Sequence, residues 1–391
     1  MTKHPRRLHA ILLALLLASS GAGLAVAGTD ELATRAAKGE PAAIIQLLEQ
    51  ARAGDAEAAL NVGMLYYEGR VVERNFALAR EWLDKAAAKG QTQAMNLIGH
   101  MYQEGLGVTQ DYVQARLWYR QAADAGLAAA ANNLGWLYLE GHGSGKSPAL
   151  AKEWFERAAE QKFPAALYNL AYLYSNGVGV PRDPQHALDL YREAAGDGYA
   201  PALRAIGWAY QTGQGVERDY AEARKWYEQA AEKGELEAEA MLGQLFQQGV
   251  GVAPDLNAAR AHFEKAAAGG DPLGQLFLGW LYQQGLGVAQ DYTSALAWYR
   301  KSAAQGNATA QNNIGYLYDE GLGVKRDDKE AMAWYRKAAK QDEPTALFNL
   351  GHMYEDARGV GRDLDEAFRY YQRAAEHGNI AAKRILGRAD R

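Results

Sequence analysis

The chain has 391 residues, of which 48% are hydrophobic, and a formal net charge of −5. It is long enough to bury more than one ordinary core, and its acidic balance argues against nucleic acid as a partner because like charges repel. The absence of cysteine excludes disulfides, thiolate metal sites and cysteine nucleophiles.

Residues 1–27 have the pattern of a secretory signal peptide. They contain no acidic residue and begin with three positive charges, at Lys3, Arg6 and Arg7. An apolar run over residues 10–18 is too short to span a bilayer as a helix, and a small-x-small cleavage pattern ends at Ala27. We expect cleavage there, with an uncleaved N-terminal anchor as the alternative. Because no later segment is apolar enough to cross a membrane, we expect a soluble protein exported to the periplasm of a Gram-negative bacterium.

Nine units of 36 residues follow one another over residues 55–378 without insertion or deletion. Each unit has a small residue after Leu, Ile or Val, here called the key position: Gly63, Gly99, Gly135, Ala171, Gly207, Gly243, Gly279, Gly315 and Gly351. An aromatic residue stands three positions later. Most units carry Trp nineteen positions after the key position: Trp82, Trp118, Trp154, Trp226, Trp298 and Trp334. This tryptophan alternates with alanine, which predicts that it packs inside the array.

Each unit is predicted to form two helices, because apolar residues recur at three- and four-residue steps in two segments. In the second unit we expect helices over about residues 92–104 and 112–125, joined by a glycine-containing loop. The loop glycines are expected to take left-handed backbone angles that end each first helix. Good N-cap residues precede every second helix: Asn75, Asp111, Ser147, Asp183, Asp219, Asp255, Asp291, Asp327 and Asp363.

Both ends of the array differ from a full unit and are predicted to be caps. Residues 28–54 match only the second half of a unit, with Ile44, Leu47 and Leu48 as the apolar stripe. Residues 379–391 match only a first helix and end in charged residues. A helix pair cannot bury both of its faces alone, so a stack of pairs needs such ends. Because capped, acidic ends disfavour end-to-end stacking, we expect a monomer.

The repeated pattern resembles the Sel-one-like repeat, a relative of the tetratricopeptide repeat. The segments AANNLGWLY (130–138) and AQNNIGYLY (310–318) are close matches, and the resemblance covers roughly residues 30–391. It implies an all-α fold, a right-handed superhelical α-solenoid of antiparallel helix pairs with the first helices on the concave side. Such proteins typically act as adaptors, assembly scaffolds or signalling regulators, and many bacterial ones are exported.

Some units depart from the family pattern. Val71 replaces the second loop glycine of the first unit, Ala357 replaces the first loop glycine of the ninth, and Ser144 stands where valine is usual. Some cysteine-rich relatives have a disulfide in each unit and are linked to β-lactam binding. This chain has no cysteine, which puts that activity in doubt.

No motif in the sequence predicts catalysis, a cofactor or a metal site. The segment GHGSGKS (141–147) resembles a phosphate-binding loop, but Glu140 stands where that motif needs glycine and the segment follows a helix rather than a strand. His100 and His352 share a register seven units apart, too far for a common metal ion. No serine, threonine or lysine has a recognisable base partner. We therefore expect a protein that is not an enzyme.

The residue directly after the key position gives the candidate binding surface, here called the ladder. Its members are Met64, His100, Trp136, Tyr172, Trp208, Gln244, Trp280, Tyr316 and His352. If this position faces the groove, the rings offer a large contact area to an extended peptide or to sugars. Nearby glutamines would add donors and acceptors: Gln103, Gln211, Gln247 and Gln283. The alternative is that the ladder packs against the adjacent unit, as aromatic stripes at helical spacing commonly do.

Three functions are compatible with these features. The leading hypothesis is a periplasmic scaffold or adaptor that binds a protein partner along the ladder. The second is an envelope assembly factor that binds polysaccharide or peptidoglycan through the same rings. The third is a cell-wall-active hydrolase of the β-lactamase-like kind, which would need a cluster of perturbed titratable groups in one cleft.

Overall fold

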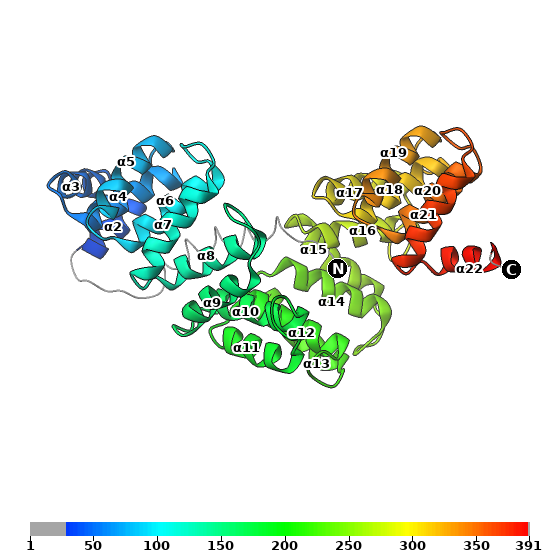
Figure 1. Cartoon of the computed structure of the whole chain (residues 1–391), viewed down its shortest axis with the longest axis horizontal. Coiled ribbons are helices and arrows are strands. Elements are labelled where there is room, and N and C mark those ends of the chain that lie inside the picture. The colour runs from blue at the N-terminus through cyan, green and yellow to red at the C-terminus, as the bar shows by residue number, and fades with distance from the viewer. Residues whose placement is uncertain (1–28, 390–391) are drawn as a thin grey trace. The chain divides into compact units, whose positions relative to one another are not determined.

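The computed structural model describes residues 29–389, which form 21 α-helices, labelled α2 to α22, joined by short loops, and no strand (Figure 1). The all-α prediction is confirmed. The predicted signal peptide of residues 1–27 lies outside the described residues. Within them, no helix has both the length and the apolar character needed to cross a membrane.

The helices divide into two compact units, and the boundary between them in the sequence falls between Tyr199 and Ala200. Each unit is a stack of antiparallel helix pairs in which consecutive helices pack side by side (Figure 1). The first unit holds repeats 1 to 4 and the second holds repeats 5 to 9.

Each repeat consists of a helix A and a helix B. The A helices are α4 (Ala56–Glu68), α6 (Thr92–Glu104), α8 (Ala128–Glu140), α10 (Pro164–Asn176), α12 (Ala200–Thr212), α14 (Leu236–Gln248), α16 (Pro272–Gln284), α18 (Ala308–Glu320) and α20 (Pro344–Glu355). The B helices are α5 (Phe76–Ala87), α7 (Tyr112–Asp124), α9 (Pro148–Ala159), α11 (Pro184–Gly196), α13 (Tyr220–Glu232), α15 (Leu256–Ala268), α17 (Tyr292–Ala304), α19 (Asp328–Ala339) and α21 (Leu364–Glu376). The nine predicted pairs are therefore present in register.

The predicted N-caps begin the B helices. The Asp111 carboxylate accepts hydrogen bonds from the backbone N–H groups of Val113 and Gln114, and Asn75 and Ser147 each cap their helix in the same way. Capping satisfies amides that the first helical turn leaves without partners. The start of each B helix is thus set by a local side chain.

The key glycines allow helix A and helix B of one repeat to touch. A Cβ atom at Gly99 would lie 2.7 Å from the ring of Tyr119, and one at Gly243 would lie 2.5 Å from the ring of Phe263. The facing residue stands twenty positions after the glycine, and its ring is fully buried in most repeats: Tyr119, Phe155, Tyr227, Phe263, Tyr299 and Tyr335. The tryptophan one position earlier is less deeply buried and covers the outside of these clusters.

Successive repeats are joined through the second loop glycine. At Gly143, whose φ is 70°, an added Cβ would lie 2.6 Å from the backbone of Tyr112, the first residue of α7 in the preceding repeat. Gly107 approaches Phe76, the first residue of α5, equally closely. Within each unit, the loop of a repeat therefore packs on the start of the helix B before it, which sets the spacing of the stack.

A helix pair precedes the nine repeats and a single helix follows them. The pair is α2 (Thr29–Ala37) and α3 (Pro41–Arg52), in the segment where half a unit was expected, and the last helix is α22 (Ile380–Ala389). Gly39, with a φ of 86°, reverses the chain between α2 and α3. Val71, the residue that replaces a loop glycine in repeat 1, packs over Gly39.

Candidate interaction surface on the A helices

The ladder residues of the first unit differ sharply in exposure. His100 and Trp136 are 3% and 2% exposed, whereas Tyr172 is 45% exposed. The hydroxyl of Tyr67, on the A helix before, lies 2.7 Å from His100 Nδ1. The ring of His142 lies 5.4 Å from the ring of Trp136. Neighbouring side chains therefore cover two of the ladder positions and leave Tyr172 uncovered.

The second unit keeps most of its ladder at the surface. Trp208 is 47% and Tyr316 is 39% exposed, while Gln244, Trp280 and His352 are half-buried. His352 contacts the ring of Phe348 edge-on, at 4.6 Å between ring centroids. The structure thus places every ladder residue on helix A as predicted, but only three aromatic members, Tyr172, Trp208 and Tyr316, are open to a partner.

The glutamines near the ladder make hydrogen bonds inside their own repeats. Gln211 Oε1 accepts from the Tyr227 hydroxyl at 2.6 Å, and Gln283 Oε1 accepts from the Tyr299 hydroxyl at 2.6 Å. Burial raises the pKa of both tyrosines well above the ordinary value, so each hydroxyl remains a donor. These glutamines hold a helix B ring in place beneath the ladder, a role that the sequence did not reveal.

Buried asparagine pairs connect the A helices of consecutive repeats. Asn133 Nδ2 donates to Asn96 Oδ1 at 3.0 Å, and Asn169 Nδ2 donates to Asn132 Oδ1 at 2.8 Å. In the second unit Asn349 donates to Asn312 at 3.1 Å. The signal in the sequence is an asparagine two or three positions before the key position. The Asn-Asn dipeptides at 132–133 and 312–313 carried the family resemblance, but the pairing was not foreseen.

One buried carboxylate lies close to two basic groups. Glu239 on α14 is 3% exposed, lies 2.7 Å from His262 Nδ1 on α15 through its Oε2 atom, and forms an ion pair with Lys265. Burial alone would raise the pKa of Glu239, but the hydrogen bonds from His262 and Lys265 outweigh it and lower that pKa. These contacts connect α14 to α15. Among residues 29–389 no group of three potential ligand side chains could hold a metal ion.

The paired helices, key glycines and inter-repeat loops define a tandem helical-repeat protein. The chain belongs to the Sel1 repeat family, whose model matches nine consecutive segments: 56–91, 92–127, 128–163, 164–199, 200–235, 236–271, 272–307, 308–343 and 344–379. The resemblance inferred from the sequence is therefore confirmed.

Two solved structures of the same family are similar to this chain. A protective antigen of uropathogenic Escherichia coli strains is 34% identical, with a TM-score of 0.56, over 88% of this chain and 82% of the antigen. A Sel1 repeat protein from Oxalobacter formigenes is 32% identical, with a TM-score of 0.55, over 80% of this chain and 92% of that protein. Comparison with curated protein sequences finds no match.

Proposed function

We propose that this chain is a non-enzymatic scaffold of the Gram-negative periplasm that binds an extended segment of a protein partner along its A helices. Helical-repeat proteins of this family fit an interaction role in general. The observation that carries the finer proposal is the exposure of Trp208 and Tyr316 at one register of the second unit, a register at which His100 and Trp136 of the first unit are buried.

Exposed tyrosine and tryptophan rings are suited to binding. They bury a large area on contact and lose little conformational entropy, which is why they dominate the energetics of many interfaces. Trp208 and Tyr172 are also flanked by polar side chains that hold the helix end, since Thr212 donates to the Trp208 carbonyl and Asn176 donates to the Tyr172 carbonyl. The rings therefore project from an ordered backbone, which lowers the entropic cost of binding.

The test compares two double variants in the second unit. Trp208→Ala/Tyr316→Ala removes the exposed ladder rings, and Leu364→Ala/Phe368→Ala removes two similarly exposed apolar side chains from helix B of repeat 9. Proteins cross-linked to each variant in periplasmic extract are quantified by mass spectrometry, with circular dichroism as the check on folding. We expect specific partners to be lost only with the ladder variant, and equal capture by both variants would refute the proposal.

Separate experiments test the two alternative functions and the periplasmic location. Binding of purified peptidoglycan that depends on Trp208 and Tyr316, with no protein partner captured, would favour the envelope-glycan function instead. Turnover of cell-wall or β-lactam substrates would overturn the non-enzymatic proposal. Cell fractionation of the chain with and without residues 1–27 tests export, because deletion of these residues should leave the protein in the cytoplasm.

A further inference from the structure

Repeats 7 and 8 carry an unusual concentration of positive charge at the ends of their B helices. Two adjacent cations stand on each helix and a fifth follows α19, and all five are exposed: Arg300, Lys301, Arg336, Lys337 and Lys340. We call these five residues the basic strip. Other repeats place at most one cation at the two equivalent positions, and several place an acid there: Asp84, Glu156, Glu193, Glu228 and Glu264.

Four members of the basic strip contact aromatic groups. Lys301 Nζ lies 3.7 Å from the ring centroid of Trp298, and Arg300 Nη2 donates to the Tyr318 hydroxyl at 2.8 Å. Repeat 8 repeats this arrangement, with Lys337 over Trp334 at 3.6 Å and Arg336 bonded to Tyr354 at 2.9 Å. Within residues 29–389 none of the five cations forms an ion pair.

Several cations on other B helices pair with a carboxylate. Arg157 pairs with Asp124 at 2.8 Å, and Arg260 pairs with Glu264 at 2.7 Å. Asp124 in repeat 2 and Lys340 in repeat 8 occupy equivalent positions. Repeat 8 therefore has a fifth positive charge where repeat 2 has an acid that pairs with a cation. Two adjacent cations without a carboxylate partner at this position are therefore a local property of repeats 7 and 8.

The cations of the two repeats form one surface. Tyr318 on α18 accepts the bond from Arg300 and packs in the same apolar cluster as Leu296 on α17 and Trp334 on α19. Lys337 lies over the ring of that same Trp334. The strip thus continues from α17 across α18 to α19, which lie together within the second unit (Figure 1).

We propose that the basic strip binds a short acidic segment of a protein partner. Five like charges without a carboxylate partner repel one another, and an anionic ligand would relieve that repulsion. The arginine groups present planar donors that match carboxylates, and one hydrogen bond to tyrosine already orients each of them. The surface is separate from the ladder, so this inference does not depend on the proposed function.

Flanking carboxylates limit the size of the ligand. Glu330 accepts a hydrogen bond from Trp334 at the start of α19, and Asp342 lies beyond its end, where it is bound by Arg373. A flat anionic membrane or a long nucleic acid would meet these acids as well as the net charge of −5. A short acidic peptide can touch the strip alone.

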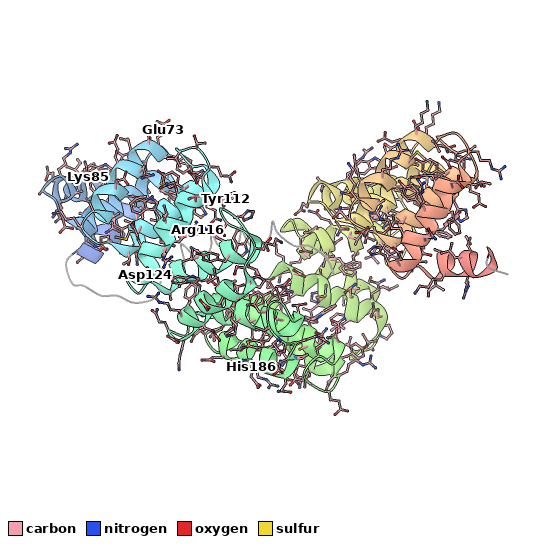
Figure 2. All side chains as sticks on the ribbon, viewed as in Figure 1. Glu73, Lys85, Tyr112, Arg116, Asp124 and His186 are labelled. Atoms are coloured by element: carbon pink, nitrogen blue, oxygen red, sulfur yellow. The ribbon has the colours of Figure 1, made fainter. Side chains whose placement is uncertain are left out.

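The experiment measures the binding of fluorescein-labelled octaglutamate by fluorescence anisotropy at low ionic strength, with the full-length chain. Arg336→Glu/Lys337→Glu reverses two charges of the strip. Lys85→Glu/Lys89→Glu reverses two exposed charges in repeat 1. Lys85 is labelled in Figure 2, and its Nζ atom lies 3.9 Å from the ring centroid of Trp82, as Lys337 lies over Trp334. We expect the strip variant to weaken binding about tenfold or more, because two ion pairs with the peptide are lost and two repulsions with its carboxylates are added. The repeat 1 variant should change it less than about twofold, because solvent and counter-ions screen remote charges.

Several outcomes would overturn the proposal. They are failure of the wild-type chain to bind octaglutamate, an equal loss in both charge variants, or binding of anionic vesicles or single-stranded DNA by the strip in place of the peptide. Circular dichroism shows whether each variant is folded, and the milder Arg336→Gln/Lys337→Gln replaces the reversal if that variant unfolds. Trp208→Ala/Tyr316→Ala should bind octaglutamate as the wild type does, which separates this test from that of the ladder.

Discussion

The ring of Phe155 lies directly over Gly135, so that a Cβ atom at Gly135 would come within 2.7 Å of the ring and 3.1 Å of the Ala151 carbonyl oxygen. We expect Gly135→Ala to destabilise the fold by about 1–3 kcal/mol, because overpacking outweighs the gain in helix propensity. The urea midpoint followed by circular dichroism measures the change. Gly145→Ala in the loop of the same repeat is the control, since a Cβ atom added at Gly145 would meet nothing within 4 Å; an equal loss in both variants would contradict the packing explanation.

Lys162 adopts a left-handed backbone conformation, with a φ of 56°, at a position where most repeats have glycine. A side chain in this conformation costs roughly 1 kcal/mol, a penalty that glycine avoids. We expect Lys162→Gly to stabilise the protein by about 0.5–1 kcal/mol and to raise its thermal midpoint. The reverse change at the equivalent Gly126, whose φ is 96°, should lower it. If Lys162→Gly is neutral or destabilising, strain at this residue is not a factor.

The Asn96–Asn133 pair predicts a difference between single and double replacement. Asn133→Leu leaves the buried Asn96 amide without its partner and should cost about 1–3 kcal/mol. Asn96→Leu/Asn133→Leu should cost much less than the sum of the single changes, because Leu60 and Leu97 occupy the same two positions in repeats 1 and 2 and pack in one cluster. A double-mutant cycle in urea gives the coupling, and additive costs would show that the bond contributes little.

The sequence predicts the fold of this chain well because its determinants are local. The cap at Asp111 acts on amides two and three residues away, and Gly105 ends α6 in the left-handed region with a φ of 71°. These caps and glycines recur with the period of the repeat, so the start and end of each helix can be predicted from their spacing in the sequence. The break at Gly39 in the N-terminal helix pair lacks this support from repetition and was not predicted.

The candidate site is less predictable because exposure depends on residues in other repeats. His100 and Tyr172 share a register, yet His100 is buried beside Tyr67 and Tyr172 is exposed. The residue that covers a ladder position lies in a different helix or loop and varies between repeats. The register of a ladder residue was therefore predictable from spacing, whereas its access to a partner required the structure.

The buried Glu239 predicts a pH-dependent contribution to stability. Because the pKa of Glu239 is held below its ordinary value of 4.5, the ionised carboxylate stabilises the fold fully above about pH 4.5, and this contribution is lost as the pH falls through the lowered pKa. Glu239→Gln should therefore lower the thermal midpoint near pH 7 and have a much smaller effect near pH 3. Glu228→Gln, at a half-exposed carboxylate paired with Arg224, is the control and should change little at either pH. A deficit that persists at low pH would point to packing and not to charge.

The two classes of ladder residue should respond differently to truncation. Trp136 is buried beside His142, so Trp136→Ala should cost about 3–5 kcal/mol through the cavity it leaves. Trp208 is half exposed at the same register, so Trp208→Ala should cost less than about 1 kcal/mol and leave the thermal midpoint nearly unchanged. Melting curves by circular dichroism compare the two. Because a binding residue must be available to its partner, a large loss of stability in Trp208→Ala would assign this residue to packing and remove it from the proposed partner surface.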